Sequence, residues 1–150
     1  MLSALALAAA VAYAHPEQLV DTDWVAAHAK DAQVRVVDVR RAGFEQGHIP
    51  DSVFLDPESI RDAANTPSFM LAPAQFEAAM GKLGISNQTR VVLYDDRGGL
   101  LAARVWWIFR LMGKMDVAVL DGGLPKWRAE GREIEDMPPI VRDRHMTVSR

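Results

Sequence analysis

The sequence contains no cysteine among its 150 residues. This absence excludes disulfide bonds, catalysis by a thiolate and zinc sites built on thiolates within the chain. It does not identify the compartment in which the protein works. The most obvious nucleophile that remains is a carboxylate.

An excess of basic charge is also lacking. The formal net charge is -3, and lysines and arginines are scattered among acids instead of forming a stripe. Nucleic-acid binding therefore has little electrostatic support, and we expect no nucleic-acid partner. Apolar residues make up 49% and charged residues 25%, as is typical of one globular domain with a substantial core.

An uncharged run, Met1 to Ala14, begins the sequence and consists mostly of alanine and leucine. It is too short to span a bilayer comfortably, so we expect no membrane span. Its small residues before His15 and Pro16 resemble a signal-peptide cleavage site, although the initial basic residue of a signal is missing. Two interpretations stay open: a cleaved signal, giving a periplasmic or secreted protein, or an N-terminal extension on a cytoplasmic one.

After that run, apolar strand-like segments alternate with helical patterns. This alternation predicts an α/β domain with a mostly parallel sheet and helices on both faces. The segment 102–112 is apolar almost all round and is expected to be a largely buried helix. The expected strands are 34–39, 52–55, 91–94 and 117–120, and the expected helices are a short one containing Trp24, then 75–83, 102–112 and 124–130.

The pattern changes after Gly131. The stretch 132–150 is polar, contains Pro138 and Pro139, and has no sustained periodicity. It is predicted to be a linker toward an absent second domain, or a tail.

The strand-like run Val91–Tyr94 ends in a loop that is typical of anion binding. Asp95 comes directly after the strand, and the glycines of the loop precede the apolar helix. At such a junction the unpaired backbone N–H groups of a helix start converge with the end of a strand. The loop consists of Asp95, Asp96, Arg97, Gly98, Gly99 and Leu100.

Five short motifs, in order, resemble the rhodanese domain, and more narrowly the N-terminal half of tandem thiosulfate and 3-mercaptopyruvate sulfurtransferases. The resemblance covers about 19–131 and implies the rhodanese-like α/β fold. The motifs are Val36-Val37-Asp38-Val39-Arg40, Phe44-Glu45-Gln46-Gly47-His48-Ile49-Pro50, Val91-Val92-Leu93-Tyr94-Asp95, Arg104-Val105-Trp106-Trp107-Ile108-Phe109-Arg110 and Leu120-Asp121-Gly122-Gly123-Leu124-Pro125-Lys126-Trp127.

In catalytic members of that family, the resemblance implies, a cysteine follows the strand and carries sulfane sulfur as a persulfide. Asp95 stands at that position, so the loop is interpreted as a degenerate copy of the active site. A carboxylate can occupy an anion-binding loop, but it cannot form an S–S bond. The isolated chain is therefore predicted to be inactive, with no cofactor and no metal. Its implied partners are a second rhodanese domain that carries the catalytic cysteine and small sulfur-containing anions at the interface between the domains.

Three basic residues are candidates for contributing to such an interdomain site. His48 matches the family's Gly-His-Ile-Pro motif and can relay a proton or bind an anion, or it can simply hold the turn through backbone hydrogen bonds. Asp51-Ser52 departs from the usual Gly-Ala that follows this motif. Arg104 and Arg110 can face a cleft, or they can form solvent-exposed ion pairs.

A second hypothesis belongs to another chemical class. Carboxylates at or near the predicted strand ends would lie on one rim of a parallel sheet, where they can hold Mg²⁺ for phosphoryl transfer or accept a phosphoryl group. The candidates are Asp38, Asp95, Asp96 and Asp121.

Overall fold

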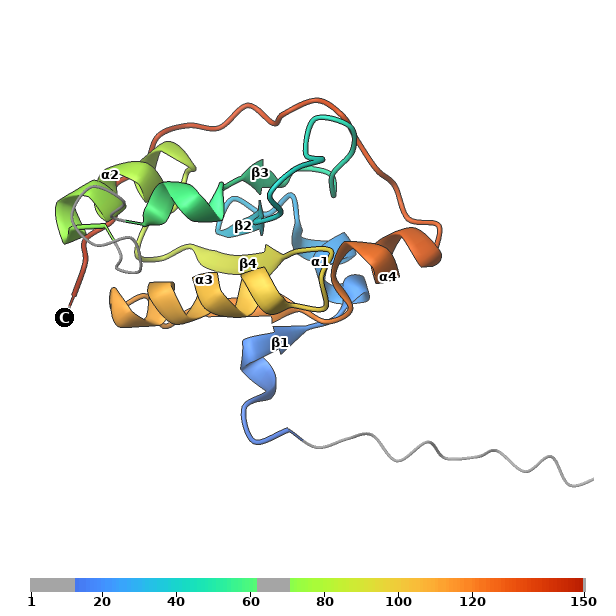
Figure 1. Cartoon of the computed structure of the whole chain (residues 1–150), viewed down its shortest axis with the longest axis horizontal. Coiled ribbons are helices and arrows are strands. Elements are labelled where there is room, and N and C mark those ends of the chain that lie inside the picture. Colours follow the sequence, from blue (N-terminus) through green and yellow to red (C-terminus); the bar gives the residue numbers. More distant parts are fainter. Residues whose placement is uncertain (1–12, 62–70, 150) are drawn as a thin grey trace, which may run out of the picture.

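The computed structural model describes residues 13–61 and 71–149 and contains one five-stranded sheet (Figure 1). The strand order is β1-β5-β4-β2-β3, and every neighbouring pair is parallel. The α/β architecture predicted from the sequence is confirmed. The strands are β1 (Leu19–Val20), β2 (Val34–Asp38), β3 (Val53–Phe54), β4 (Arg90–Tyr94) and β5 (Val117–Leu120), and the helices are α1 (Thr22–His28), α2 (Pro73–Lys82), α3 (Leu100–Leu111) and α4 (Gly123–Ala129).

Local sequence signals set several of these boundaries. The Asp21 carboxylate accepts a hydrogen bond from the Trp24 N–H and caps α1. Pro73 occupies the first turn of α2, where its missing N–H would have no helical partner. Short 3₁₀ turns, Pro16–Gln18 and Pro57–Ile60, and the two-residue strand β1 were not predicted, because segments this short carry almost no periodicity.

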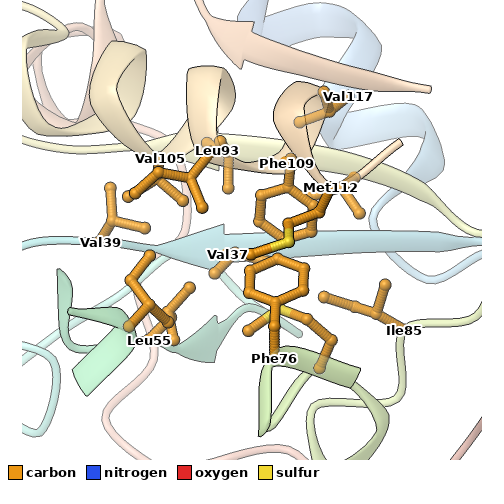
Figure 2. Close-up of a cluster of buried hydrophobic side chains, with 14 of the residues drawn as sticks. Val37, Val39, Leu55, Phe76, Ile85, Leu93, Val105, Phe109, Met112 and Val117 are labelled. Carbon is orange, nitrogen blue, oxygen red and sulfur yellow. The ribbon is translucent and has the colours of Figure 1, made fainter. Parts of the chain in front are cut away.

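Helices cover both faces of the sheet and enclose two hydrophobic cores. Alternate residues of β4 belong to different cores: Leu93 packs toward α2 and α3, and Val92 packs toward α1 and α4. Figure 2 shows the first core, where Phe76 of α2 and Phe109 of α3 meet edge to face across 5.3 Å beside Val37. Burial on both faces explains why the central strands are nearly continuous apolar runs.

Helix α3 departs from its expected burial. It begins at Leu100, two residues before the predicted start, and one side of it reaches solvent. The side chain of Leu100 is 69% exposed and that of Trp107 is 54% exposed. The expectation of a largely buried helix is therefore wrong for this side, because composition alone does not show which apolar side chains face the sheet.

Residues 132–149, here called the C-terminal strap, run back across the domain toward α2 (Figure 1). At one end of the strap, Glu135 pairs antiparallel with His48 through two backbone hydrogen bonds. Near the other end, Met146 is buried in the core between the sheet, α2 and α3, and the Ser149 N–H donates to the Met112 carbonyl. The polar composition of the strap gave no signal for these contacts. The predicted second domain stays a prediction.

In residues 13–61 and 71–149, no helix combines the length and apolar character needed to cross a membrane. The predicted signal segment, Met1 to Ala14, lies almost entirely outside the described residues, so the predicted localisation stays a prediction.

Candidate functional site

The loop between β4 and α3 encloses the side chain of Asp95, which is 1% exposed. Its Oδ1 accepts hydrogen bonds from the backbone N–H groups of Arg97 (3.0 Å) and Gly99 (2.9 Å). Its Oδ2 accepts from those of Leu101 (2.8 Å) and Ala102 (2.9 Å). One carboxylate thus satisfies four backbone donors, two of which belong to the first turn of α3.

Glycines allow the loop to adopt this shape. Gly98 and Gly99 have φ angles of 68° and 89°, in the left-handed region that side chains disfavour. Gly123 serves a different purpose, since a Cβ atom there would lie 2.5 Å from the Asp95 carbonyl oxygen. That close approach lets the Leu124 N–H donate to the same oxygen at 3.0 Å. The start of α4 therefore fixes the residue on which the loop is built.

The geometry defines an anion cradle that the chain fills with its own carboxylate. Converging N–H groups and the positive end of the α3 dipole stabilise negative charge at this point. Because both Asp95 oxygens are held, attack by this carboxylate on a phosphoryl group would first require it to give up those hydrogen bonds. The outer side of the loop, including Asp96, Arg97 and Leu100, is exposed.

A buried polar network lies at the ends of β2 and β4, where Tyr94 directly precedes the loop. Arg40 donates from Nε and Nη2 to the Asp38 carboxylate, with a shortest distance of 2.6 Å, and also from Nη2 to the Gly47 carbonyl. The Tyr94 hydroxyl donates to Asp38 Oδ2 at 3.1 Å and accepts from the Ile49 N–H. The network joins the ends of β2 and β4 to the turn that carries His48.

Burial and charge shift the pKa values of this network. Burial raises the pKa of the Tyr94 hydroxyl, and the neighbouring Asp38 charge raises it further, so Tyr94 stays neutral. Burial alone would lower the pKa of Arg40, but its hydrogen bond to Asp38 and the charge of that carboxylate outweigh burial and raise it. From the sequence, Asp38 was interpreted as a carboxylate at a strand end, without Arg40 or Tyr94 as its partners. The Asp-x-Arg spacing at a strand end, and a tyrosine in an otherwise aliphatic strand, were the available signals for the network.

His48 has a fully buried side chain. Its Nδ1 lies 2.8 Å from the Phe44 carbonyl oxygen, and its Nε2 lies 3.0 Å from that of Met137 and 3.4 Å from Glu135 Oε1. The ring also stacks on Phe44 at 3.8 Å. In the described residues, His48 thus fastens the C-terminal strap to the turn.

The two candidate arginines occupy different parts of α3. Arg104 is exposed in the first half of the helix, on the loop side. Arg110 lies in the last turn, where its guanidinium is 5.2 Å from the Trp106 ring centroid. At 1.5 Å per residue, Arg110 is about 15 Å along the helix from Leu100. The structure therefore brings Arg104 near the loop and does not bring Arg110 there.

The four aspartates of the magnesium hypothesis do not converge. Asp38 is paired with Arg40, and Asp95 is held by backbone N–H groups. Asp96 and Asp121 are exposed. Within residues 13–61 and 71–149, no group of three or more acidic, histidine or cysteine side chains is placed to hold a metal ion. A shared rim of the sheet is not enough to make a metal site here. The two buried carboxylates, those of Asp38 and Asp95, already accept hydrogen bonds from Arg40 and from backbone N–H groups.

Comparison with known proteins identifies the family to which this fold belongs. The family model of the rhodanese-like domain matches residues 21–130. This segment contains the complete Asp95 loop and every strand of the sheet except β1. The chain belongs to the rhodanese-like family. The matched segment ends before the C-terminal strap begins.

Relatives of this rhodanese-like chain include sulfur-handling proteins. It is 37% identical over 130 residues to thiosulfate/3-mercaptopyruvate sulfurtransferase 1, mitochondrial, of Arabidopsis thaliana, covering 79% of this chain and 34% of the relative. It is 40% identical over 140 residues to the sulfur carrier protein TtuD of Thermus thermophilus, covering 85% of this chain and 46% of the relative. The chain thus spans less than half the length of these relatives.

The fold is also similar to a solved structure, that of SseA from Escherichia coli, which is described with the rhodanese fold and catalytic mechanism of 3-mercaptopyruvate sulfotransferases. The TM-score is 0.80 at 28% sequence identity, and the match covers 88% of this chain and 55% of SseA. Both comparisons support homology to thiosulfate and 3-mercaptopyruvate sulfurtransferases.

Proposed function

We propose that this chain is a non-catalytic rhodanese domain that works together with a second, cysteine-bearing rhodanese domain in thiosulfate or 3-mercaptopyruvate sulfur transfer. The observation that carries the proposal is the Asp95 carboxylate in the anion cradle. Carboxylate oxygens of Asp95 occupy the position from which a cysteine thiolate would have to act, and the chain contains no cysteine elsewhere. The sulfurtransferase relatives, of which the chain covers less than half, support the assignment of a partner domain.

In this proposal the domain has a structural and interface role. Arg104 is the best placed of the three basic candidates to meet a small sulfur-containing anion, because it is exposed near the Asp95 loop. His48 would contribute indirectly, by fixing the turn and the C-terminal strap. Arg110 would need a partner surface that extends along the whole of α3.

The first test is turnover by the purified chain. We expect no thiocyanate from thiosulfate and cyanide, and no pyruvate from 3-mercaptopyruvate, above the rate of a heat-denatured control. Turnover that copurifies with the chain through two different columns would contradict the proposed non-catalytic role.

The second test replaces the cradle's carboxylate with a thiol. In Asp95→Cys, four N–H groups and the α3 dipole should favour the thiolate, so its pKa should lie below the ordinary value of about 8.5. Attack of this thiolate on the outer sulfur of thiosulfate would form a cysteine persulfide and release sulfite. Asp96→Cys, at the exposed neighbouring position, is the control. Iodoacetamide reactivity measured against pH compares the two thiols, and equal pKa values would argue against a surviving sulfur site.

A further inference from the structure

Four side chains form an exposed stripe along α3: Leu100, Arg104, Trp107 and Leu111, here called the α3 stripe. They follow one another at intervals of four, three and four residues, which places them on one face of the helix. Leu100 is 69% exposed, Trp107 54% and Leu111 41%. The opposite face, with Val105 and Phe109, is buried against the sheet.

The α3 stripe leaves considerable apolar surface in water. Its two leucines and tryptophan are joined by a single charged residue, so they form one band instead of isolated exposed side chains. The neighbouring Trp106 differs, because its ring N–H donates to the Val117 carbonyl and its ring contacts Arg110. Contacts within the domain therefore explain the position of Trp106. The exposed ring of Trp107 is instead available for a contact outside the chain.

The order of residues in the α3 stripe is self-complementary. If two α3 helices pack antiparallel about a two-fold axis that passes between positions 105 and 106, Leu100 faces Leu111 of the second copy. The same axis places Arg104 opposite Trp107, and each of these contacts occurs twice, as an isologous interface requires. The four, three, four spacing is that of the a and d positions that antiparallel helices use for packing.

We propose that the α3 stripe pairs two copies of this chain in an antiparallel dimer. Its polar contact would be a guanidinium on an indole ring, an interaction that this domain already uses internally. Arg90 lies 5.2 Å from the Trp24 ring centroid, Arg110 5.2 Å from that of Trp106, and Arg132 5.4 Å from that of Trp127. The leucines at each end would exclude water from the two Arg104–Trp107 pairs.

The size of the α3 stripe sets the expected strength of the dimer. A helix of 12 residues is about 18 Å long, so one helix pair buries less than the roughly 1,200 Å² that stable interfaces start from. The dimer should therefore be weak, with a Kd on the order of 10–500 µM. The proposal rests on α3 and not on the Asp95 cradle, but it uses Arg104, so a copy of the chain that is paired in the dimer does not present Arg104 to a partner domain at the same time.

Sedimentation equilibrium of the purified chain from about 10 µM to 1 mM tests the association. We expect the average mass to rise with concentration toward that of a dimer, and Trp107→Glu to weaken association by at least about tenfold. Ile140→Glu is the matched control, because Ile140 is fully exposed on the C-terminal strap and should leave the Kd unchanged. A monomer throughout this range, or equal effects of the two substitutions, would overturn the proposal. Turnover is measured separately, so an inactive monomer would overturn only the dimer, and an active dimer only the proposed function.

Crosslinking tests the register, and the natural absence of cysteine removes any background. Leu100→Cys and Leu111→Cys are made as separate proteins, mixed in equal amounts and oxidised. The antiparallel register predicts that the mixed disulfide between positions 100 and 111 forms faster than either homodisulfide. Homodisulfides at equal or greater rates would overturn this register. Protection of position 107 only by an added cysteine-bearing rhodanese domain would assign the α3 stripe to that partner instead.

Discussion

The backbone N–H of Ala102 donates a 2.9 Å hydrogen bond to Oδ2 of Asp95, seven residues earlier in the chain. This bond ties the end of β4 to the first turn of α3, and the N–H groups of Arg97, Gly99 and Leu101 reinforce it. The Asp95 carboxylate thereby links the end of the strand to the start of the helix through four hydrogen bonds.

Removing the Asp95 carboxylate should destabilise the fold. Asp95→Ala leaves four N–H groups without their acceptor, two of them at the start of α3, and should lower the free energy of unfolding by about 2–4 kcal/mol. Asp96→Ala, at the exposed neighbour, should change it by less than about 0.5 kcal/mol. Urea denaturation followed by tryptophan fluorescence measures both. Formate should partly restore the stability of Asp95→Ala and not that of Asp96→Ala, because a free carboxylate fits the vacated cradle.

Tyr94 should make stability fall in strongly alkaline solution. Its pKa is raised in the folded protein, whereas an unfolded tyrosine ionises near pH 10. Above about pH 10 the unfolded state loses this proton first, so stability should fall by up to about 1.4 kcal/mol per pH unit. Tyr94→Phe should remove this part of the slope. It should also cost about 1–3 kcal/mol at neutral pH, because the Ile49 N–H loses its acceptor.

Urea denaturation of both proteins at pH 8 to 11 measures the difference in slope. Phenolate absorbance provides a second readout, since the difference between wild type and Tyr94→Phe isolates this tyrosine. Parallel stability curves, or a Tyr94 phenolate that forms near pH 10 in the folded protein, would contradict the buried network.

His48 should control how firmly the C-terminal strap is held. His48→Ala removes the ring that contacts the Met137 carbonyl and stacks on Phe44. The Glu135 N–H, which donates to the His48 carbonyl, should then exchange with deuterium at least about tenfold faster. His15→Ala, at an exposed histidine, should leave that exchange unchanged. Unaltered protection at Glu135 in His48→Ala would show that the ring is not what fastens the strap.

Met146 should contribute to the core although it lies 17 residues beyond Ala129, the last residue of α4. Met146→Ala leaves a cavity beside α2 and α3 and should cost about 2–4 kcal/mol of stability. Met137→Ala removes a side chain of the same type from an exposed position of the same strap and should cost less than about 0.5 kcal/mol. Thermal denaturation measures the stability of the two variants. Similar losses of stability in both would mean that the end of the strap is not packed in solution.

The sequence predicted those parts of the fold that carry periodic or capping signals. The strand 117–120 was predicted with its observed limits, and the short helix that contains Trp24 was predicted where α1 lies. The prediction that α3 is largely buried was only half right. The exposed helix face that carries Trp107 cannot be distinguished by composition from the buried face that carries Phe109. The packing of Met146 depends on contacts between segments that are far apart in the chain, so no local sequence pattern could predict it.

The candidate site divides in the same way. An anion-binding loop was predicted from the position of Asp95 after a strand and before a glycine-containing turn, and in the structure four backbone N–H groups of this segment donate to the Asp95 carboxylate. The pairing of Asp38 with Arg40 and Tyr94 joins two neighbouring strand ends, and only the parallel register of β2 and β4 brings it about. The enclosure of His48 likewise depends on a strap that the sequence left as a linker or tail.

The backbone of the C-terminal strap touches that of α2 at Gly81, where the Arg144 N–H donates to the Gly81 carbonyl and a Cβ atom would meet the Arg144 carbonyl oxygen at 2.4 Å. A fragment excised at the limits of the family match would lose this seam and uncover the groove that Met146 fills. Such a fragment would expose the apolar core surface to which Phe76 and Met80 belong. It would therefore aggregate or bind other proteins nonspecifically, for reasons unrelated to sulfur chemistry.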